Sequence, residues 1–247
     1  MTADQWTRAV RHQLGLGRLL PLGGPNDGAW ISERAADSVL RRAAEEVRGV
    51  RLTALRIALA DPEDTREPVV PPPASALPPG ALRVTAEFTA SASQPLPTAA
   101  ARLRTVLAAA ATERLGLTVT EVDLRVTDLL EGDEVPSGPS AEPEPEPTPG
   151  PPRTPDAPDT PASAARSADE QRVAAAALTV PGVVRVTGAR VEELGGGQAV
   201  LPHRHVRLEV AVGLGVRALD VALEVRARVA QSLPDHPTAA VLVAAVS

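Results

Sequence analysis

Val47-Arg48-Gly49-Val50 and Val180-Pro181-Gly182-Val183 are two versions of one short turn, and their repetition indicates how the chain is organised. Each version follows an alanine-rich helical pattern and precedes a run of β-prone residues. A strictly alternating strand comes next in each half, at residues 82–88 and 206–212, and is followed by an amphipathic helix and a last strand. The order helix, strand, strand, helix, strand therefore occurs twice, which indicates an internal duplication.

A helix is predicted after the short β-prone segment Ala29-Trp30-Ile31. Ser32 is suited to its N-cap, and Gly49 to the left-handed conformation that ends many helices. The buried face of this helix consists of Ala36, Val39, Leu40, Ala43 and Val47. With the preceding strand, the first half has the order βαββαβ of a ferredoxin-like sandwich, and the second half has the order αββαβ. We therefore expect an α+β protein with two ferredoxin-like sandwich domains.

The stretch between the halves has the composition of a disordered linker. Residues 131–162 hold eight acidic residues, one arginine and eleven of the 26 prolines. Such a stretch cannot form a hydrophobic core. The predicted organisation is an N-terminal segment with a short helix at 1–27, a domain at 28–130, a linker at 131–168 and a second domain at 169–247. The proline-rich loop of residues 61–80 is expected to be a solvent-side insertion.

The composition excludes several classes of site. All 25 basic residues are arginine, so that a Schiff-base lysine and the lysine of a P-loop are absent. The chain has no cysteine, and therefore no disulfide, thiolate ligand or cysteine nucleophile. No apolar run approaches the roughly 20 residues of a membrane-spanning helix, and the N-terminal residues lack the pattern of a secretory signal. We expect a cytosolic protein that is not an enzyme and binds no cofactor.

Two histidines have the spacing of a pair of metal ligands. His203 and His205 lie two residues apart at the start of a strand, so that their side chains point to the same side. A third ligand is missing, because we expect the last strand to run antiparallel to its neighbour, which places His236 at the opposite end of the sheet. We therefore predict solvated edge histidines and no metal site. Asp235 and His236 resemble part of a hydrolytic triad, but the sequence has no Gly-x-Ser-x-Gly elbow.

A sheet of this kind can also bind RNA through exposed aromatic side chains. The chain has only two tryptophans, Trp6 and Trp30, one phenylalanine, Phe88, and no tyrosine. The outward positions of the alternating strands carry charges of both signs, at Arg83, Thr85, Glu87, Glu121, Asp123 and Arg125. A face with charges of both signs does not attract the phosphate backbone of a nucleic acid. We therefore do not expect nucleic acid as a partner. An RNA-binding module that uses arginine-rich helix faces stays as an alternative, and an uncharacterised hydrolase as another.

At these motifs the sequence resembles the alkaline-shock-protein family, also called the general-stress Gls family. The matching segments are Gly28-Ala29-Trp30-Ile31-Ser32, the two turns quoted above, and residues 117–126 and 210–216. Arg48 stands where the family usually has proline, and the tandem layout differs from that of single-domain members. The resemblance implies a non-enzymatic protein of the envelope-stress response. It implies self-association, binding to paralogues and recruitment to the membrane by a small anchor protein.

Two apolar segments are the predicted interaction sites. Residues 239–246 break the alternation, so that Val241, Leu242 and Val243 make both faces of the last strand apolar. We favour a protein contact there, with the other half of the chain, a second copy or a paralogue, over small side chains tolerated at the surface. In the N-terminal segment, Trp6, Val10 and Leu14 form a stripe at helical spacing. We favour packing of this stripe on its own domain over a docking helix for a partner or a lipid interface.

Overall fold

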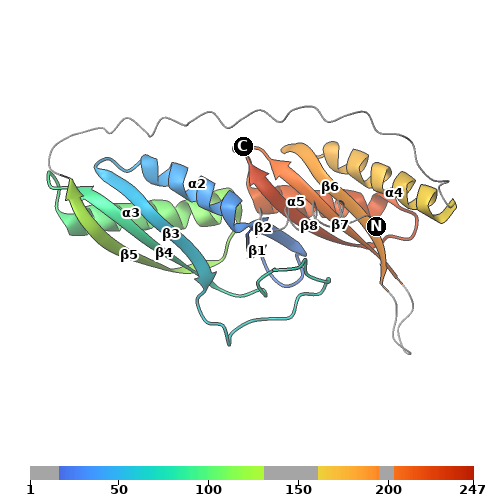
Figure 1. Ribbon diagram of the computed structural model, residues 1–247, viewed down its shortest axis with the longest axis horizontal. Helices are drawn as coiled ribbons and strands as arrows, with labels where there is room; N and C mark the ends of the chain where they lie inside the picture. Colours follow the sequence, from blue (N-terminus) through green and yellow to red (C-terminus); the bar gives the residue numbers. More distant parts are fainter. Residues whose placement is uncertain (1–16, 131–160, 195–202) are drawn as a thin grey trace, which may run out of the picture.

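The computed structural model describes residues 17–130, 161–194 and 203–247 of the 247-residue chain. Figure 1 shows two sheets that lie next to each other along the long axis, each with helices packed on one face. Within the described residues, the fold is therefore mixed α+β with two sheets and four α-helices. This class is the one that the sequence predicts.

The first sheet has three strands, in the order β3-β4-β5. β3 (Val50–Leu59) is antiparallel to β4 (Leu82–Ser91), and β5 (Val119–Leu130) is parallel to β4. The helices α2 (Glu33–Glu45) and α3 (Leu96–Ala109) pack on this unit, and the π-helical turn η1 (Ala110–Leu115) extends α3. Alternation along β4 gives the core face, because Val84, Ala86 and Phe88 are fully buried and the residues between them are not.

The second sheet repeats this unit and adds two strands to it. β6 (Val183–Leu194) and β7 (His203–Val212) form the hairpin, and β8 (Thr238–Val246) is parallel to β7. The helices α4 (Pro161–Leu178) and α5 (Ala218–Ser232) take the places of α2 and α3. β1 (Leu19–Leu22) and β2 (Ala29–Ser32) complete the five-stranded order β1-β2-β8-β7-β6.

The turn and the parallel ladder have the same geometry in the two units. The amide of Ser91 donates to the carbonyl of Gly49 at 2.8 Å, and the amide of Gly213 donates to the carbonyl of Gly182 at 2.9 Å. Gly49 and Gly182 both have positive φ angles, +71° and +95°, which glycine adopts without a steric penalty. Both parallel ladders also contain a bulge at the same place, between Phe88 and Thr89 in one and between Val210 and Ala211 in the other. The repeated turn thus occupies equivalent positions in the two units.

The place of β2 corrects the predicted topology of the first half. Ala29, Trp30 and Ile31 pair in parallel with Val241, Leu242 and Val243 of β8, and the sandwich expected for residues 28–130 lacks its first strand. All four residues of β2 are buried, on both faces of the sheet. The first sheet has one charged face, where Trp30 would be exposed to water. The second sheet buries both faces of this strand, and burial of an indole stabilises that location.

The predicted domain boundaries differ from the observed packing in two further respects. Residues 19–32 belong to the second sheet, and one continuous core contains residues of both halves, among them Leu40, Phe88 and Val243. The helix α4 begins at Pro161, so that residues 161–168 are helical where the linker was expected. Residues 131–160 of that linker lie outside the described residues.

Candidate interaction surfaces

The predicted contact residues Val241, Leu242 and Val243 are buried against the first half of the same chain. Val241 and Val243 belong to the main core. Leu242 faces the other side of the sheet, is 5% exposed and packs in a small second core with Leu19, Trp30, Val70 and Ala240. Of the three partners considered for this strand, the structure places the other half of the chain beside it.

The loop of residues 61–80 provides part of this second core. Val70 is buried against the sheet rather than exposed in a solvent-side insertion. The loop is held by backbone hydrogen bonds, from Leu19 to the Ser75 carbonyl at 3.2 Å and from Leu77 to the Leu19 carbonyl at 2.8 Å. Figure 1 shows it leaving β3 and passing below β1 and β2. Most residues of this loop are exposed or half-buried, as expected for a solvent-side insertion, but Val70 is not. Sequence periodicity does not show which apolar side chain of a loop packs against a sheet.

The other predicted interaction residues, Trp6, Val10 and Leu14, lie outside the described residues. The choice between packing and docking for this stripe stays a prediction.

Only one of the two histidines is solvated as predicted. His203 is exposed, but His205 is fully buried, and its Nδ1 lies 2.8 Å from the hydroxyl of Thr238 on β8. Its Nε2 has no hydrogen-bond partner among the described residues. Burial lowers the pKa of His205 from 6.5 to about 4, and the charges of Arg207 and His203 act in the same direction. Glu192 and a hydrogen bond to the backbone of Thr238 oppose this lowering of the pKa.

The predicted direction of the last strand was also wrong. β8 is parallel to β7, because the helix α5 returns the chain to the same end of the sheet. Asp235 and His236 therefore lie at the end where β7 begins, and Arg204 Nη1 contacts Asp235 Oδ1 at 3.3 Å. His236 Nδ1 lies 3.1 Å from the carbonyl of Ala230. Among the residues that the structure describes, no three histidine or acidic side chains form a group that could hold a metal ion.

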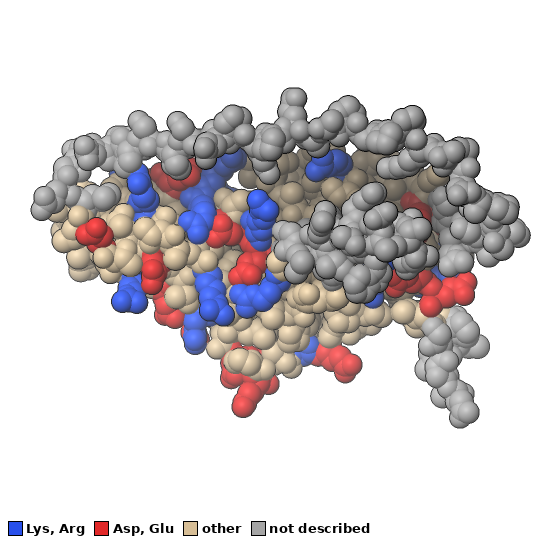
Figure 2. Space-filling model, viewed as in Figure 1, with Lys and Arg blue, Asp and Glu red and all other residues tan. Residues whose placement is uncertain are grey.

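The outer face of the first sheet carries the mixed charges that the strand pattern predicts. Arg83 contacts Glu121 and also Asp123, the latter at 3.6 Å, and Arg125 lies 3.7 Å from Glu87. Figure 2 shows basic and acidic side chains interspersed over the side of the molecule that carries β3, β4 and β5. This face differs from the apolar outer face of β2 and β8, although the two sheets are duplicates.

A second difference between the duplicates is at the edge of the last strand. β8 pairs with β7 on one side and with β2 on the other, whereas β5 pairs with β4 only, within the described part of the chain. Val126 is 36% exposed and Leu129 is 47% exposed on β5. Val243, the counterpart of Val126, is fully buried. This edge was not recognised from the sequence, because the periodicity of a strand does not report how many neighbours it has.

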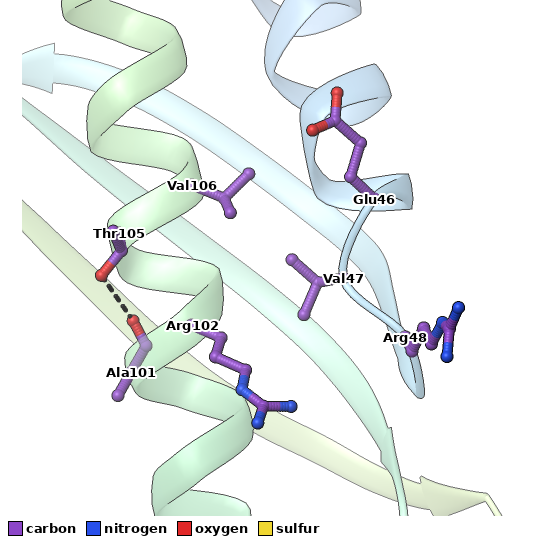
Figure 3. A pocket seen from close by; sticks show the side chains of 7 residues that line it. All are labelled: Glu46, Val47, Arg48, Ala101, Arg102, Thr105 and Val106. Atoms are coloured by element: carbon purple, nitrogen blue, oxygen red, sulfur yellow. Dashed lines mark hydrogen bonds between the residues drawn. The ribbon is translucent and has the colours of Figure 1, made fainter.

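An open groove of about 530 Å³ lies between the end of α2 and the outer face of α3. In Figure 3, Val47 and Val106 point toward each other across it, and Arg48 and Arg102 lie at one end. Glu46 at the other end is paired with Arg114 at 2.8 Å. None of the buried polar atoms without a partner in the described ranges belongs to a residue of this groove.

None of the helices in the described ranges is long and apolar enough to cross a membrane. No protein-family model matches the chain, and no curated protein matches it either.

Proposed function

We propose that this protein is a non-enzymatic interaction scaffold that assembles through the open edge of β5. The main support for this proposal is the difference between β5 and β8, its counterpart in the second sheet. The same position of the duplicated unit holds an added strand on β8 and holds no strand on β5, among the residues described. An unpaired strand edge presents backbone donors and acceptors that another strand can pair with.

The chain itself contains an example of the proposed contact. β2 adds to β8 in parallel, and the amide of Val241 donates to the carbonyl of Gly28 at 3.0 Å. The added strand also covers the apolar side chains of β8. The exposed Val126 and Leu129 on β5 would gain the same kind of cover from a partner strand, and burial of apolar surface favours association.

The other outer edges of the two sheets also carry contacts. Arg18 Nη2 donates to the carbonyl of Ile57 on β3 at 2.9 Å, and the amide of Val191 on β6 donates to Glu170 at 3.3 Å. The edge of β1 is bonded to the loop at Ser75 and Leu77. On β5, one exposed side chain, Arg104, contacts the carbonyl of Val122 at 3.2 Å, and it can turn away when a strand binds.

The cellular role that fits such a scaffold is the one that the resemblance to the alkaline-shock family implies. The protein would assemble with itself or with paralogues of the same architecture in the envelope-stress response. A small membrane-anchor protein is a further partner in this proposal. The envelope-stress role rests on the resemblance, whereas the place of contact rests on the strand edges.

The test of this proposal blocks the edge of β5 without disturbing the core. Val126→Lys places a charged side chain at the open edge, where it hinders the approach of another strand. Val184→Lys is the matched control, because Val184 is a 57% exposed valine on the edge strand β6. We expect Val126→Lys to reduce assembly of the full chain in light scattering and in cross-linking within cells, and Val184→Lys to leave it unchanged. Equal assembly of both variants and the original protein would refute the proposal.

A further inference from the structure

We propose that β5 pairs with β5 of a second copy, antiparallel and centred on Leu124, so that two three-stranded sheets become one six-stranded sheet. The inference rests on the proposed function and deepens it, because it names the partner and the register at that same edge. The two-fold symmetry of such a contact lets one surface serve both copies.

Alternate residues of β5 direct their backbone groups to the open edge. The carbonyl of Val122 is contacted by Arg104 from α3, outside the β4–β5 ladder. Alternate residues of a strand direct their backbone groups to the same side. Val122, Leu124 and Val126 therefore face the edge.

The pairing of β8 in the second unit indicates the same orientation for the backbone of β5. Ala86 and Leu208 each lie five residues before the equivalent turn amides of Ser91 and Gly213. Leu124 pairs with Ala86, and Val241 pairs with Leu208, so that Leu124 and Val241 are counterparts. The amide of Val241 is the one that donates to β2. The amide of Leu124 thus has the position of a donor to an added strand.

The side chains select the register. With Leu124 opposite Leu124 of the second copy, Val122 lies opposite Val126 of that copy, and the exposed part of Val126 is covered by an apolar partner. On the outer face, Asp123 lies opposite Arg125 of the second copy, and this pair occurs twice. Opposite charges at directly facing positions stabilise antiparallel pairs, and like charges destabilise them.

The two neighbouring symmetric registers are less favourable. Centring the contact on Arg125 places two arginines opposite each other, and centring it on Asp123 places two carboxylates opposite each other. Both arrangements bring like charges together at the two-fold axis, where their separation is smallest. The register centred on Leu124 places the uncharged leucine at that axis.

Charge reversal tests the register directly. Asp123→Arg places arginines at both positions of each facing pair, and Arg125→Asp places carboxylates there. We expect each variant alone to weaken the dimer of the full chain by about tenfold or more, measured by sedimentation equilibrium. An equimolar mixture of the two variants restores both opposite-charge pairs, as does the double variant. Both should therefore dimerise like the original protein. Glu45→Arg, an equal charge change at an exposed position on α2, is the control and should have no effect.

The outcomes separate this inference from the proposed function. A monomeric original protein, or single variants that dimerise as strongly as it does, would overturn the inference. If Val126→Lys abolishes assembly but the charge-reversed mixture does not restore it, β5 is the contact and the register or the partner is wrong. If Val126→Lys leaves assembly intact, the proposed function fails as well.

Discussion

Acidification should destabilise the fold through His205, and this effect can be isolated from all other titrating groups. The buried imidazole has a pKa of about 4, against an ordinary value of 6.5 in the unfolded chain. Between these two values the unfolded chain binds more protons than the folded one, so that stability falls as the pH falls. Well above pH 6.5, His205 is neutral in both the folded and the unfolded chain and contributes almost nothing to the pH dependence of stability.

The magnitude follows from the two pKa values. Between pH 7 and pH 5 the linkage relation gives a loss of about 2 kcal/mol, and the loss approaches about 3 kcal/mol below pH 4. Carboxylates titrate in part of this range too, so that the original protein alone would not identify the group responsible. His205→Asn removes the titrating ring and keeps a polar group near the hydroxyl of Thr238.

The assay is urea unfolding at pH 7 and at pH 5, followed by far-UV circular dichroism. The original protein should lose about 2 kcal/mol more than His205→Asn between the two pH values. His203→Asn is the control, because His203 is exposed on the same strand, and it should behave like the original protein. The same pH dependence in His205→Asn as in the original protein would show that the imidazole is not buried as described.

Two further predictions concern the contact between the halves. Gly116 has φ of +90°, and a Cβ built on it would lie 2.4 Å from the Cβ of Leu219 on α5. Gly116→Ala should therefore cost about 2–4 kcal/mol of unfolding free energy in urea, whereas Gly17→Ala, with φ of +69° and no neighbour within 4 Å, should show the backbone strain alone. Equal costs for the two variants would contradict the close packing of the halves. Leu242→Glu buries a carboxylate beside Trp30 and should cost at least about 3 kcal/mol, with a lower thermal midpoint. Leu242→Met should cost less than about 1.5 kcal/mol, and a Leu242→Glu protein as stable as that variant would count against the second core.

The local elements of the fold could be predicted from the sequence, because local patterns determine them. Ser32 accepts a hydrogen bond from the amide of Ala35 at 3.1 Å as the N-cap of α2. The buried face of that helix contains the predicted Ala36, Val39, Leu40 and Ala43. The alternation of β4 likewise gave its buried face. These features depend on residues within a few positions of each other.

The incorrect predictions concern segments whose neighbours in the fold are distant in the sequence. β2 has four residues, and its pattern does not say which sheet it joins. A usable signal was present, because Trp30-Ile31 and Val241–Val243 are both apolar on two faces and so need the same kind of environment. His205 alternates with the core residue Val206, which places it on the outer face, but its burial depends on what covers that face. The open edge of β5 was missed because it is a property of the assembled sheets.

The pairing of β2 with β8 leaves apolar residues of β2 without their partner strand during synthesis of the chain. Ser32 donates to the carbonyl of Ala244 at 2.9 Å, and the two residues are 212 positions apart. At ribosomal speeds of about 5–20 residues per second, Trp30 and Ile31 leave the ribosome roughly 10 to 40 s before the strand that shelters them exists. During that interval, β2 can pair with β8 of another chain that has already been completed nearby. Exchange of the β1–β2 hairpin between molecules is therefore the misassembly to which crowded translation would expose this protein.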